Sequence, residues 1–183
     1  MVLLLTTIST TFFVPGSPVE CTRPTPISFA TAPQPTASRT NAHREKARAL
    51  VRHLAGPWTR MVHTAARQAH VSPRLIAAVI DVENHGDVAG SAHRVSTAGA
   101  IGPMQLMPNT AWNTLHVNPW IPRQNIDGGA RFLHQLIMMF HGDIREALVA
   151  YNAGPTATAR GFATAQSWHY ADAVLVAEQG STG

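Results

Sequence analysis

The 183-residue chain has 14 Lys and Arg residues against ten acidic ones, a net charge of +4, and 13 of the 14 cations are Arg. This basic balance favours an anionic partner such as a membrane or an acidic polymer, but the arginines are scattered and form no basic run, which argues against a dedicated nucleic-acid patch. The single cysteine, Cys21, excludes an intramolecular disulfide framework and a cysteine-based zinc site.

The N-terminal segment is expected to lie outside the folded domain. Residues from Met1 to Val14 contain no charged side chain. They are too short to cross a bilayer as a helix, which needs about 20 apolar residues, but they suit the apolar region of a secretory signal peptide. We therefore expect a signal peptide over residues 1–20 with no lipid anchor on Cys21, and a disordered Pro-, Thr- and Ala-rich spacer over residues 21–40.

Helical periodicity begins at Asn41 and returns, between breaks, to about residue 180. The expected helices combine apolar residues at helical spacing with Gly, Pro or Asn at their ends, and they cover residues 41–55, 58–70, 72–83, a stretch from 108–109 onward, 125–142, 143–151 and 167–177. Ser72, Asn125 and Ser167 are predicted as N-caps of three of them, and Pro73 as the first residue of the helix that Ser72 caps. The Gly- and Ser-rich stretch 84–107 predicts a loop with a small β-hairpin.

These elements predict a mainly α fold. We expect a single helical domain of about seven helices with one small loop or β-hairpin insert. Its expected parts are an N-terminal helix over residues 41–57, which breaks at Gly56-Pro57, and a main domain over residues 58–180.

Glu83 closes the third expected helix on the same face as Ile76 and Ile80. Partial burial and the negative end of the helix dipole both disfavour a carboxylate there, so both raise its pKa. A raised pKa is what a general acid working near neutral pH needs. On helix position alone, an exposed Glu at a frayed helix end is the alternative interpretation.

Three sequence blocks follow one another in a fixed order. They are Ser72–Glu83; Ser96–Pro108, which reads Ser-Thr-Ala-Gly-Ala-Ile-Gly-Pro-Met-Gln-Leu-Met-Pro; and Ala147–Pro155, which reads Ala-Leu-Val-Ala-Tyr-Asn-Ala-Gly-Pro. With Asn125-Ile-Asp-Gly-Gly129, these blocks strongly resemble the catalytic domain of the soluble-lytic-transglycosylase (SLT) family. The resemblance covers about residues 58–176 and implies a lysozyme-like α+β fold with a sugar-binding cleft.

The resemblance implies roles for seven residues. Glu83 matches the family's single catalytic acid and base. The residues that match positions lining the sugar cleft or facing the acid are Ser96, Met104, Gln105, Tyr151, Asn152 and Tyr170. Without the resemblance, Tyr151 suits a core aromatic and Asn152 a helix C-cap.

The family mechanism needs only one carboxylate. Asp81 lies about 200° around the helix from Glu83, and Asp87 is the nearest other candidate. The resemblance implies that Glu83 protonates the glycosidic oxygen between N-acetylmuramic acid and N-acetylglucosamine, and then takes the proton of the muramyl 6-hydroxyl. The product is a 1,6-anhydromuramyl end formed without water, and no metal or organic cofactor is implied.

The sequence departs from the family pattern around the acid. Asn84 stands where a Ser usually follows the catalytic Glu, and Pro103 replaces a Leu before Met104. The connection from Glu83 to Ser96 is a few residues longer than usual. These departures concern the grip on the substrate rather than the identity of the acid.

Taken together, the chain is expected to be a periplasmic peptidoglycan lytic transglycosylase, a carbon–oxygen lyase. Its expected partner is the peptidoglycan glycan strand, and its small size suggests local work for an envelope-spanning secretion or pilus machine. We expect a monomer with no nucleic-acid partner and no stable membrane span. Two alternatives stay open: a lysozyme-type hydrolase that uses Asp87 or a positioned water, and a non-catalytic peptidoglycan-binding assembly protein.

Overall fold

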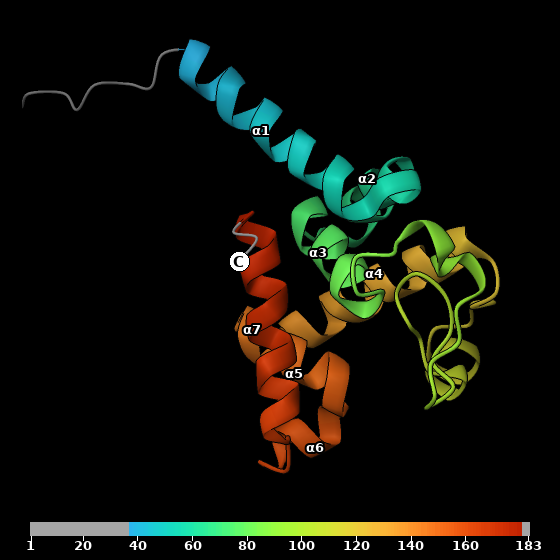
Figure 1. Ribbon diagram of the computed structural model, residues 1–183. Helices are drawn as coiled ribbons and strands as arrows, with labels where there is room; N and C mark the ends of the chain where they lie inside the picture. The colour runs from blue at the N-terminus through green and yellow to red at the C-terminus, as the bar shows by residue number, and fades with distance from the viewer. Residues whose placement is uncertain (1–36, 181–183) are drawn as a thin grey trace, which may run out of the picture. The chain divides into compact units, whose positions relative to one another are not determined.

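The computed structural model describes residues 37–180 (Figure 1). Its helices in chain order are α1 (Ala37–Ala55), α2 (Thr59–Ala69), α3 (Pro73–Glu83), α4 (Pro122–Met139), α5 (Ile144–Ala153), α6 (Pro155–Ala159) and α7 (Ala165–Gln179). The expected signal peptide and residues 21–36 of the expected spacer lie outside the described residues. Within residues 37–180, no helix combines the length and the apolar character that crossing a membrane requires.

The predicted mainly α fold is confirmed. Short 3₁₀ segments at Gly56–Trp58 and Ala89–His93 and one π-helical turn at Thr110–Thr114 accompany the α-helices. In the described part of the chain there is no β-strand. The stretch expected to hold a β-hairpin forms two isolated antiparallel bridges instead, and both of them use Ile101.

Two of the three predicted N-caps, Asn125 and Ser167, are wrong. α4 begins at Pro122, so Asn125 lies inside its first turn and is buried. α7 is capped by Thr164, whose hydroxyl accepts a hydrogen bond from the backbone N–H of Ser167. Asn and Ser suit several positions near a helix start, and the choice among them depends on contacts elsewhere in the fold.

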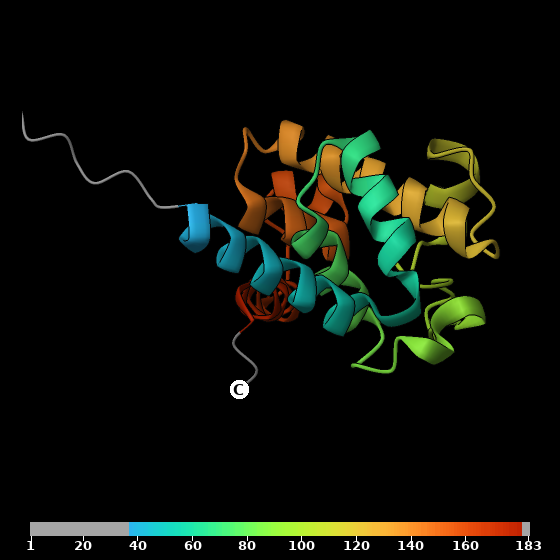
Figure 2. The same ribbon diagram turned by 90° about the horizontal axis from the view of Figure 1, so that it is seen from above.

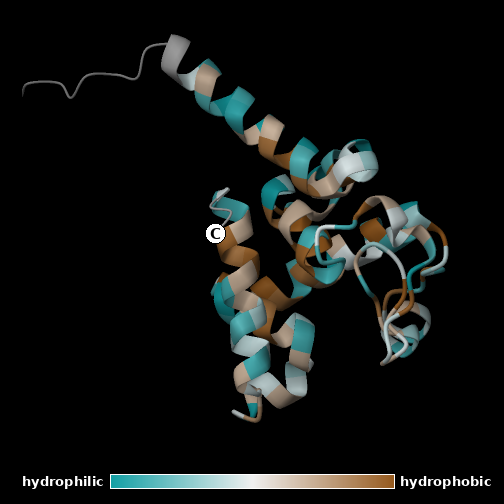
Figure 3. Cartoon of the chain, in the orientation of Figure 1, coloured by the Kyte–Doolittle hydropathy of each residue, from teal (hydrophilic) through white to brown (hydrophobic). Residues whose placement is uncertain are grey.

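The centre of the core is α3. Its residues Leu75–Ile80 are all buried, and the helix packs against α1, α2 and α7. Figure 2 shows it between α1 and α2. Apolar residues gather on the faces that these helices turn toward one another (Figure 3). Ser72 caps the helix and Pro73 opens it, as predicted. Because the last residue of this buried helix is Glu83, the core itself determines where that carboxyl group lies.

A buried asparagine docks the 101–105 loop onto α4. Asn125 Nδ2 donates to the backbone carbonyls of Ile101 at 2.7 Å and Pro119 at 3.2 Å. Its Oδ1 accepts a hydrogen bond from the backbone N–H of Met104 at 2.8 Å. One side chain thus binds three buried backbone groups, of which the Met104 N–H and the Pro119 carbonyl belong to irregular segments where regular secondary structure does not pair them.

We expect Asn125→Ala to lower the free energy of unfolding by about 2–4 kcal/mol, because it leaves the N–H of Met104 and the carbonyl of Pro119 without a partner and removes one of the two hydrogen bonds to the carbonyl of Ile101. Urea denaturation followed by circular dichroism measures this change. Asn41→Ala, which alters an exposed side chain of α1, is the control and should change the value by less than about 0.5 kcal/mol. Equal stability of the two variants would contradict the docking role.

Candidate active site

Glu83 is half-buried at the end of α3. Its Oε1 accepts a hydrogen bond from the Tyr170 hydroxyl, with 2.7 Å between the two oxygens. Burial raises the pKa of Glu83 to about 7, and the hydrogen bond from Tyr170 opposes this rise by a smaller amount. Near neutral pH the side chain therefore exists both as the acid and as the carboxylate, the two forms that a general acid and base must adopt.

Two tyrosines from different helices accompany Glu83. Tyr170 of α7 contacts the carboxyl group, while Tyr151 of α5 donates a hydrogen bond to the backbone carbonyl of Met104 at 2.9 Å. Burial raises the pKa of both tyrosines, and the negative charge of Glu83 raises it further, so both stay protonated hydrogen-bond donors. Because α7 packs against both α3 and α5, residues 87 positions apart in the sequence meet here.

Met104 and Gln105 belong to the 101–105 loop. The Met104 side chain is fully buried and lies against Gly129, where an added Cβ would stand 2.5 Å from the sulfur. Gln105 has a positive φ of 47°, and its Nε2 donates to the Gly102 carbonyl at 2.8 Å. Both side chains therefore determine the shape of the loop, and the part of Met104 that contacts Tyr151 is its backbone carbonyl.

Ser96 and Asn152 are the remaining residues for which the sequence predicts a place near the acid or in the sugar cleft. The Ser96 hydroxyl accepts a hydrogen bond from the backbone N–H of Ala100 at 3.0 Å, which closes a turn. Asn152 is exposed in the last turn of α5, and the C-cap of that helix is Gly154, so the capping role considered for Asn152 is wrong. In the described residues, neither side chain forms a hydrogen bond with Glu83.

The two departures from the family pattern contact each other. The side-chain Nδ2 of Asn84 donates to the carbonyl of Pro103 at 2.8 Å and to the carbonyl of Ile80 at 2.7 Å. The Ser that usually follows the acid has a single hydroxyl donor and a shorter reach, so it could not make both bonds. Asn84 is fully buried and ties the last turn of α3, directly beside Glu83, to the 101–105 loop.

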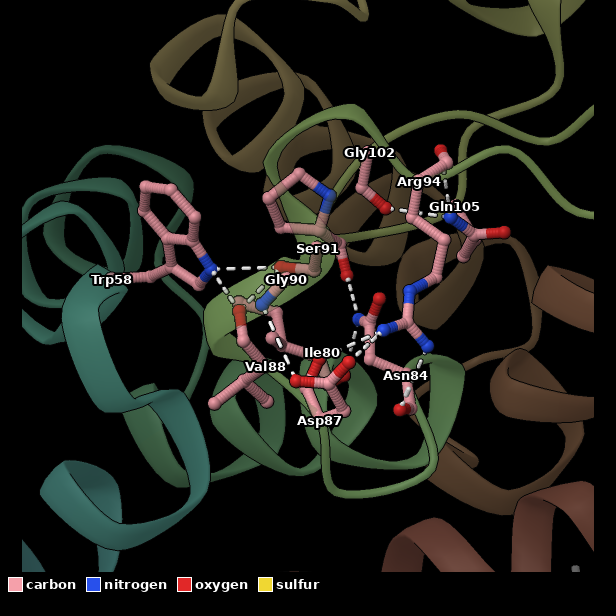
Figure 4. A network of polar contacts seen from close by, with 11 residues as sticks. Trp58, Ile80, Asn84, Asp87, Val88, Gly90, Ser91, Arg94, Gly102 and Gln105 are labelled. Carbon is pink, nitrogen blue, oxygen red and sulfur yellow. Dashed lines mark hydrogen bonds and ion pairs between the residues drawn. The ribbon is translucent and has the colours of Figure 1, made fainter.

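Arg94 organises the longer connection between Glu83 and Ser96 (Figure 4). Its guanidinium donates to the backbone carbonyl of Asn84 at 3.1 Å and to that of Asp87 at 3.2 Å, and it pairs with the Asp87 carboxylate. That carboxylate also accepts a hydrogen bond from the backbone of the same loop. Asp87 is not among the groups that shift the pKa of Glu83, so the candidate second carboxylate serves the loop instead.

Trp58 holds the other end of this connection. Its indole N–H donates to the Val88 carbonyl at 3.0 Å and to the Ser91 hydroxyl at 2.9 Å, as Figure 4 shows. Neither Trp58 nor Arg94 belongs to the sequence blocks that carry the family resemblance. Because a partly buried indole N–H needs a hydrogen-bond partner, a structural role of Trp58 could have been expected from the sequence. Nothing in the sequence indicated the role of Arg94.

The described residues contain no group of three or more His, Cys, Asp or Glu side chains placed to hold a metal ion. The chemistry that this arrangement can perform is proton transfer at one carboxyl group. In such a transfer Glu83 would be the proton donor, and Tyr170 would stabilise the carboxylate that remains, because a hydrogen bond to the charged form favours that form.

Comparison with known proteins gives consistent matches. Residues 60–173 match the model of the transglycosylase SLT domain family. A transglycosylase of Enterobacteria phage PRD1 is 38% identical over 97 residues, which are 53% of this chain and 35% of that protein. Membrane-bound lytic murein transglycosylase F 1 of Alkalilimnicola ehrlichii is 37% identical over 116 residues, 58% of this chain and 23% of that protein. The chain thus spans about a third or less of the length of these relatives.

Solved structures show the same fold at lower identity. The soluble lytic transglycosylase SLT70 of Escherichia coli superposes with a TM-score of 0.59 and 21% identity over 70% of this chain and 24% of that one. An inactive mutant of the lytic transglycosylase Slt of Pseudomonas aeruginosa gives a TM-score of 0.57 and 22% identity over 69% of this chain and 25% of that one. The lysozyme-like arrangement of helices expected from the sequence is therefore present.

The raised pKa of Glu83 makes stability depend on pH. Between about pH 4.5 and 7 the folded protein keeps a proton that the unfolded chain has lost, so the free energy of unfolding should fall as pH rises through this window and level off above it. We expect Glu83→Gln, a neutral side chain of the same shape, to be more stable than the wild type at pH 8 by about 2–3 kcal/mol.

Urea denaturation at several pH values between 4 and 8 measures this difference, which should shrink toward pH 4. Glu146→Gln, at an exposed carboxyl group in the first turn of α5, should show no such convergence. Parallel stability curves for the wild type and Glu83→Gln would contradict the burial of the carboxyl group.

Proposed function

Because this chain belongs to the family of transglycosylase SLT domains, we propose that it is a peptidoglycan lytic transglycosylase that acts outside the cytoplasm. The observation that carries this proposal is the half-buried Glu83, which has a pKa of about 7 and accepts a hydrogen bond from Tyr170. The names of two relatives, which are called lytic murein transglycosylases, support the same substrate.

In the proposed reaction, protonated Glu83 donates its proton to the glycosidic oxygen between N-acetylmuramic acid and N-acetylglucosamine. The bond from C1 to that oxygen breaks, and the 2-acetamido group of the substrate stabilises the cationic centre. The Glu83 carboxylate then takes the proton of the muramyl 6-hydroxyl while O6 bonds to C1. Glu83 regains the proton that it gave, no water is consumed, and the product is a 1,6-anhydromuramyl end.

The burial of Glu83 and the hydrogen bond that it accepts from Tyr170 each suit one stage of this cycle. Burial keeps the proton on the carboxyl group near neutral pH, as the first step requires. The hydroxyl of Tyr170 donates to the carboxylate that exists between the two steps, where a charge-assisted hydrogen bond is strongest. Substrate contacts from Ser96, Asn152 and the 101–105 loop remain predictions.

The lysozyme-type alternative is less well supported. Hydrolases of that kind place a second carboxylate about 5–9.5 Å from the acid. The candidate for that carboxylate, Asp87, is instead engaged by Arg94 and by the backbone N–H of Gly90. The further expectations of a monomer, and of work for a secretion or pilus machine, stay predictions.

Identification of the muropeptide ends tests the proposed reaction. Purified peptidoglycan digested with the protein should release fragments with 1,6-anhydromuramyl ends, identified by mass spectrometry. Glu83→Gln should lower the release by at least about a thousandfold, because it removes the proton donor, whereas Glu146→Gln should retain activity. Reducing ends would indicate a hydrolase, and no release by the wild type would indicate a binding protein; both outcomes contradict the proposal.

The pH dependence of cleavage gives a second test. Since Glu83 must be protonated in the free enzyme, kcat/KM should fall about tenfold per pH unit above pH 7. Tyr170→Phe removes the hydrogen bond that lowers the pKa of Glu83, so this descending limb should move to higher pH while the maximum falls. Tyr151→Phe, which removes a bond to Met104 instead, is the control, and an equal shift in both variants would contradict the assignment.

A further inference from the structure

The net charge of the protein is concentrated in one helix. Five of the 14 Lys and Arg residues and one of the ten acidic residues lie in α1, which leaves nine of each sign in the rest of the chain. α1 therefore carries the whole net charge of +4, although most of the arginines lie elsewhere in the chain, where acids balance them. The rest of the molecule is neutral.

A groove lies between this helix, α2 and the beginning of α3. It encloses about 440 Å³. Its cationic rim consists of the exposed arginines Arg44, Arg48 and Arg74, and its more buried apolar lining includes Ala47, Val51 and Pro73. No acidic side chain lines it. We call this the α1 groove.

The rim arginines have no partner. Within residues 40–180, Arg44, Arg48 and Arg74 form neither an ion pair nor a hydrogen bond, whereas most of the ion pairs in the structure join arginines elsewhere, such as Arg94 and Arg145, to acids. Arg44 and Arg48 are one helical turn apart, where like charges destabilise a helix. The groove thus holds mutually repelling cations that an anionic ligand would neutralise.

A second groove of about 470 Å³ adjoins the first on the other side of α1. The two share His43, Ala47 and Arg74, and the second adds Lys46 and no acidic lining residue. Two acids lie close by without lining the α1 groove: Glu178 accepts a hydrogen bond from Ser72 at 3.3 Å, and Glu45 of α1 pairs with Arg52. A cationic, concave surface therefore continues around the helix.

The shape and lining of the groove favour a narrow acidic chain over a flat surface. A membrane would reach the rim but not the apolar lining, and residues 40–49 of α1 include no large apolar side chain that could insert into lipid. A nucleic-acid backbone would pair with the cations and leave the apolar lining unused. Carboxylates separated by small apolar side chains match both parts, since Arg binds carboxylates with two parallel hydrogen bonds.

We propose that the α1 groove binds the short acidic peptides that peptidoglycan carries, whose alanine methyl groups would lie on Ala47, Val51 and Pro73 while their carboxylates pair with the rim arginines. This rests on the proposed function for the choice of polymer. Arg74 and Glu83 stand near opposite ends of α3, about 14 Å apart along its axis. The groove is thus a second contact with the polymer, and linked contacts raise the overall affinity without any change at the acid.

The test measures binding with cleavage switched off. In a Glu83→Gln background, sedimentation with insoluble peptidoglycan should show that Arg44→Gln, Arg48→Gln and Arg74→Gln together weaken binding at least tenfold. The matched control is Arg60→Gln, Arg67→Gln and Arg160→Gln, which removes the same charge from three exposed arginines that also lack an ion pair. The control should weaken binding less than threefold, and a soluble alanine- and glutamate-containing peptide should compete for the intact groove.

Three outcomes would overturn the proposal: equal loss in both triple variants, unchanged binding in the groove variant, or equal binding of the parent protein to glycan strands stripped of their peptides. Vesicles containing phosphatidylglycerol and duplex DNA are run in parallel, and a loss confined to either one would assign the groove to that partner instead. Because binding is read without cleavage, a failure of the proposed function appears separately, as the absence of anhydro ends from the wild type.

Discussion

The partial burial of one carboxyl group is the constraint on which the site depends. Glu83 ends a helix whose residues Leu75–Ile80 are all buried, and the packing of that helix against α1, α2 and α7 holds its end in place. Loss of hydration raises its pKa to about 7, and the only polar side chain that hydrogen-bonds to it in the described residues is the hydroxyl of Tyr170. The same burial that makes Glu83 useful as an acid makes its charged form unfavourable for folding.

The irregular 101–105 loop is held in place by two buried asparagines. Asn125 reaches it from α4 and Asn84 from the end of α3, and Tyr151 of α5 contacts its backbone. Three helices are therefore coupled through backbone groups of one short segment. Pro103 lacks a backbone N–H, but its carbonyl is the group that Asn84 binds, so the two departures from the family pattern form one interaction.

The distribution of charge separates two parts of the molecule. The helices that hold Glu83 and the tyrosines belong to a part with equal numbers of cations and acids, whereas α1 carries all of the excess positive charge. Because this part carries no net charge, burial and one hydrogen bond determine the pKa of Glu83. Arg74, the arginine of the α1 groove that lies in α3, stands about 14 Å along the helix axis from Glu83. An acidic polymer bound there would have little effect on that pKa, since charges at this distance are strongly screened by solvent and salt.

The sequence by itself determined the elements whose signals lie within a few residues: the capped start of α3 at Ser72 and Pro73, the acid at its end, and the ordered blocks that resemble the SLT family. It did not determine which side chains meet. Asn125 looked like an N-cap but binds a loop, Asp87 looked like a second carboxylate but pairs with Arg94, and Tyr170 reaches Glu83 across 87 positions. Helix starts and ends depend on local backbone preferences, which a short window contains. The partners of a buried polar group depend on how distant segments pack, so only the tertiary structure decided them.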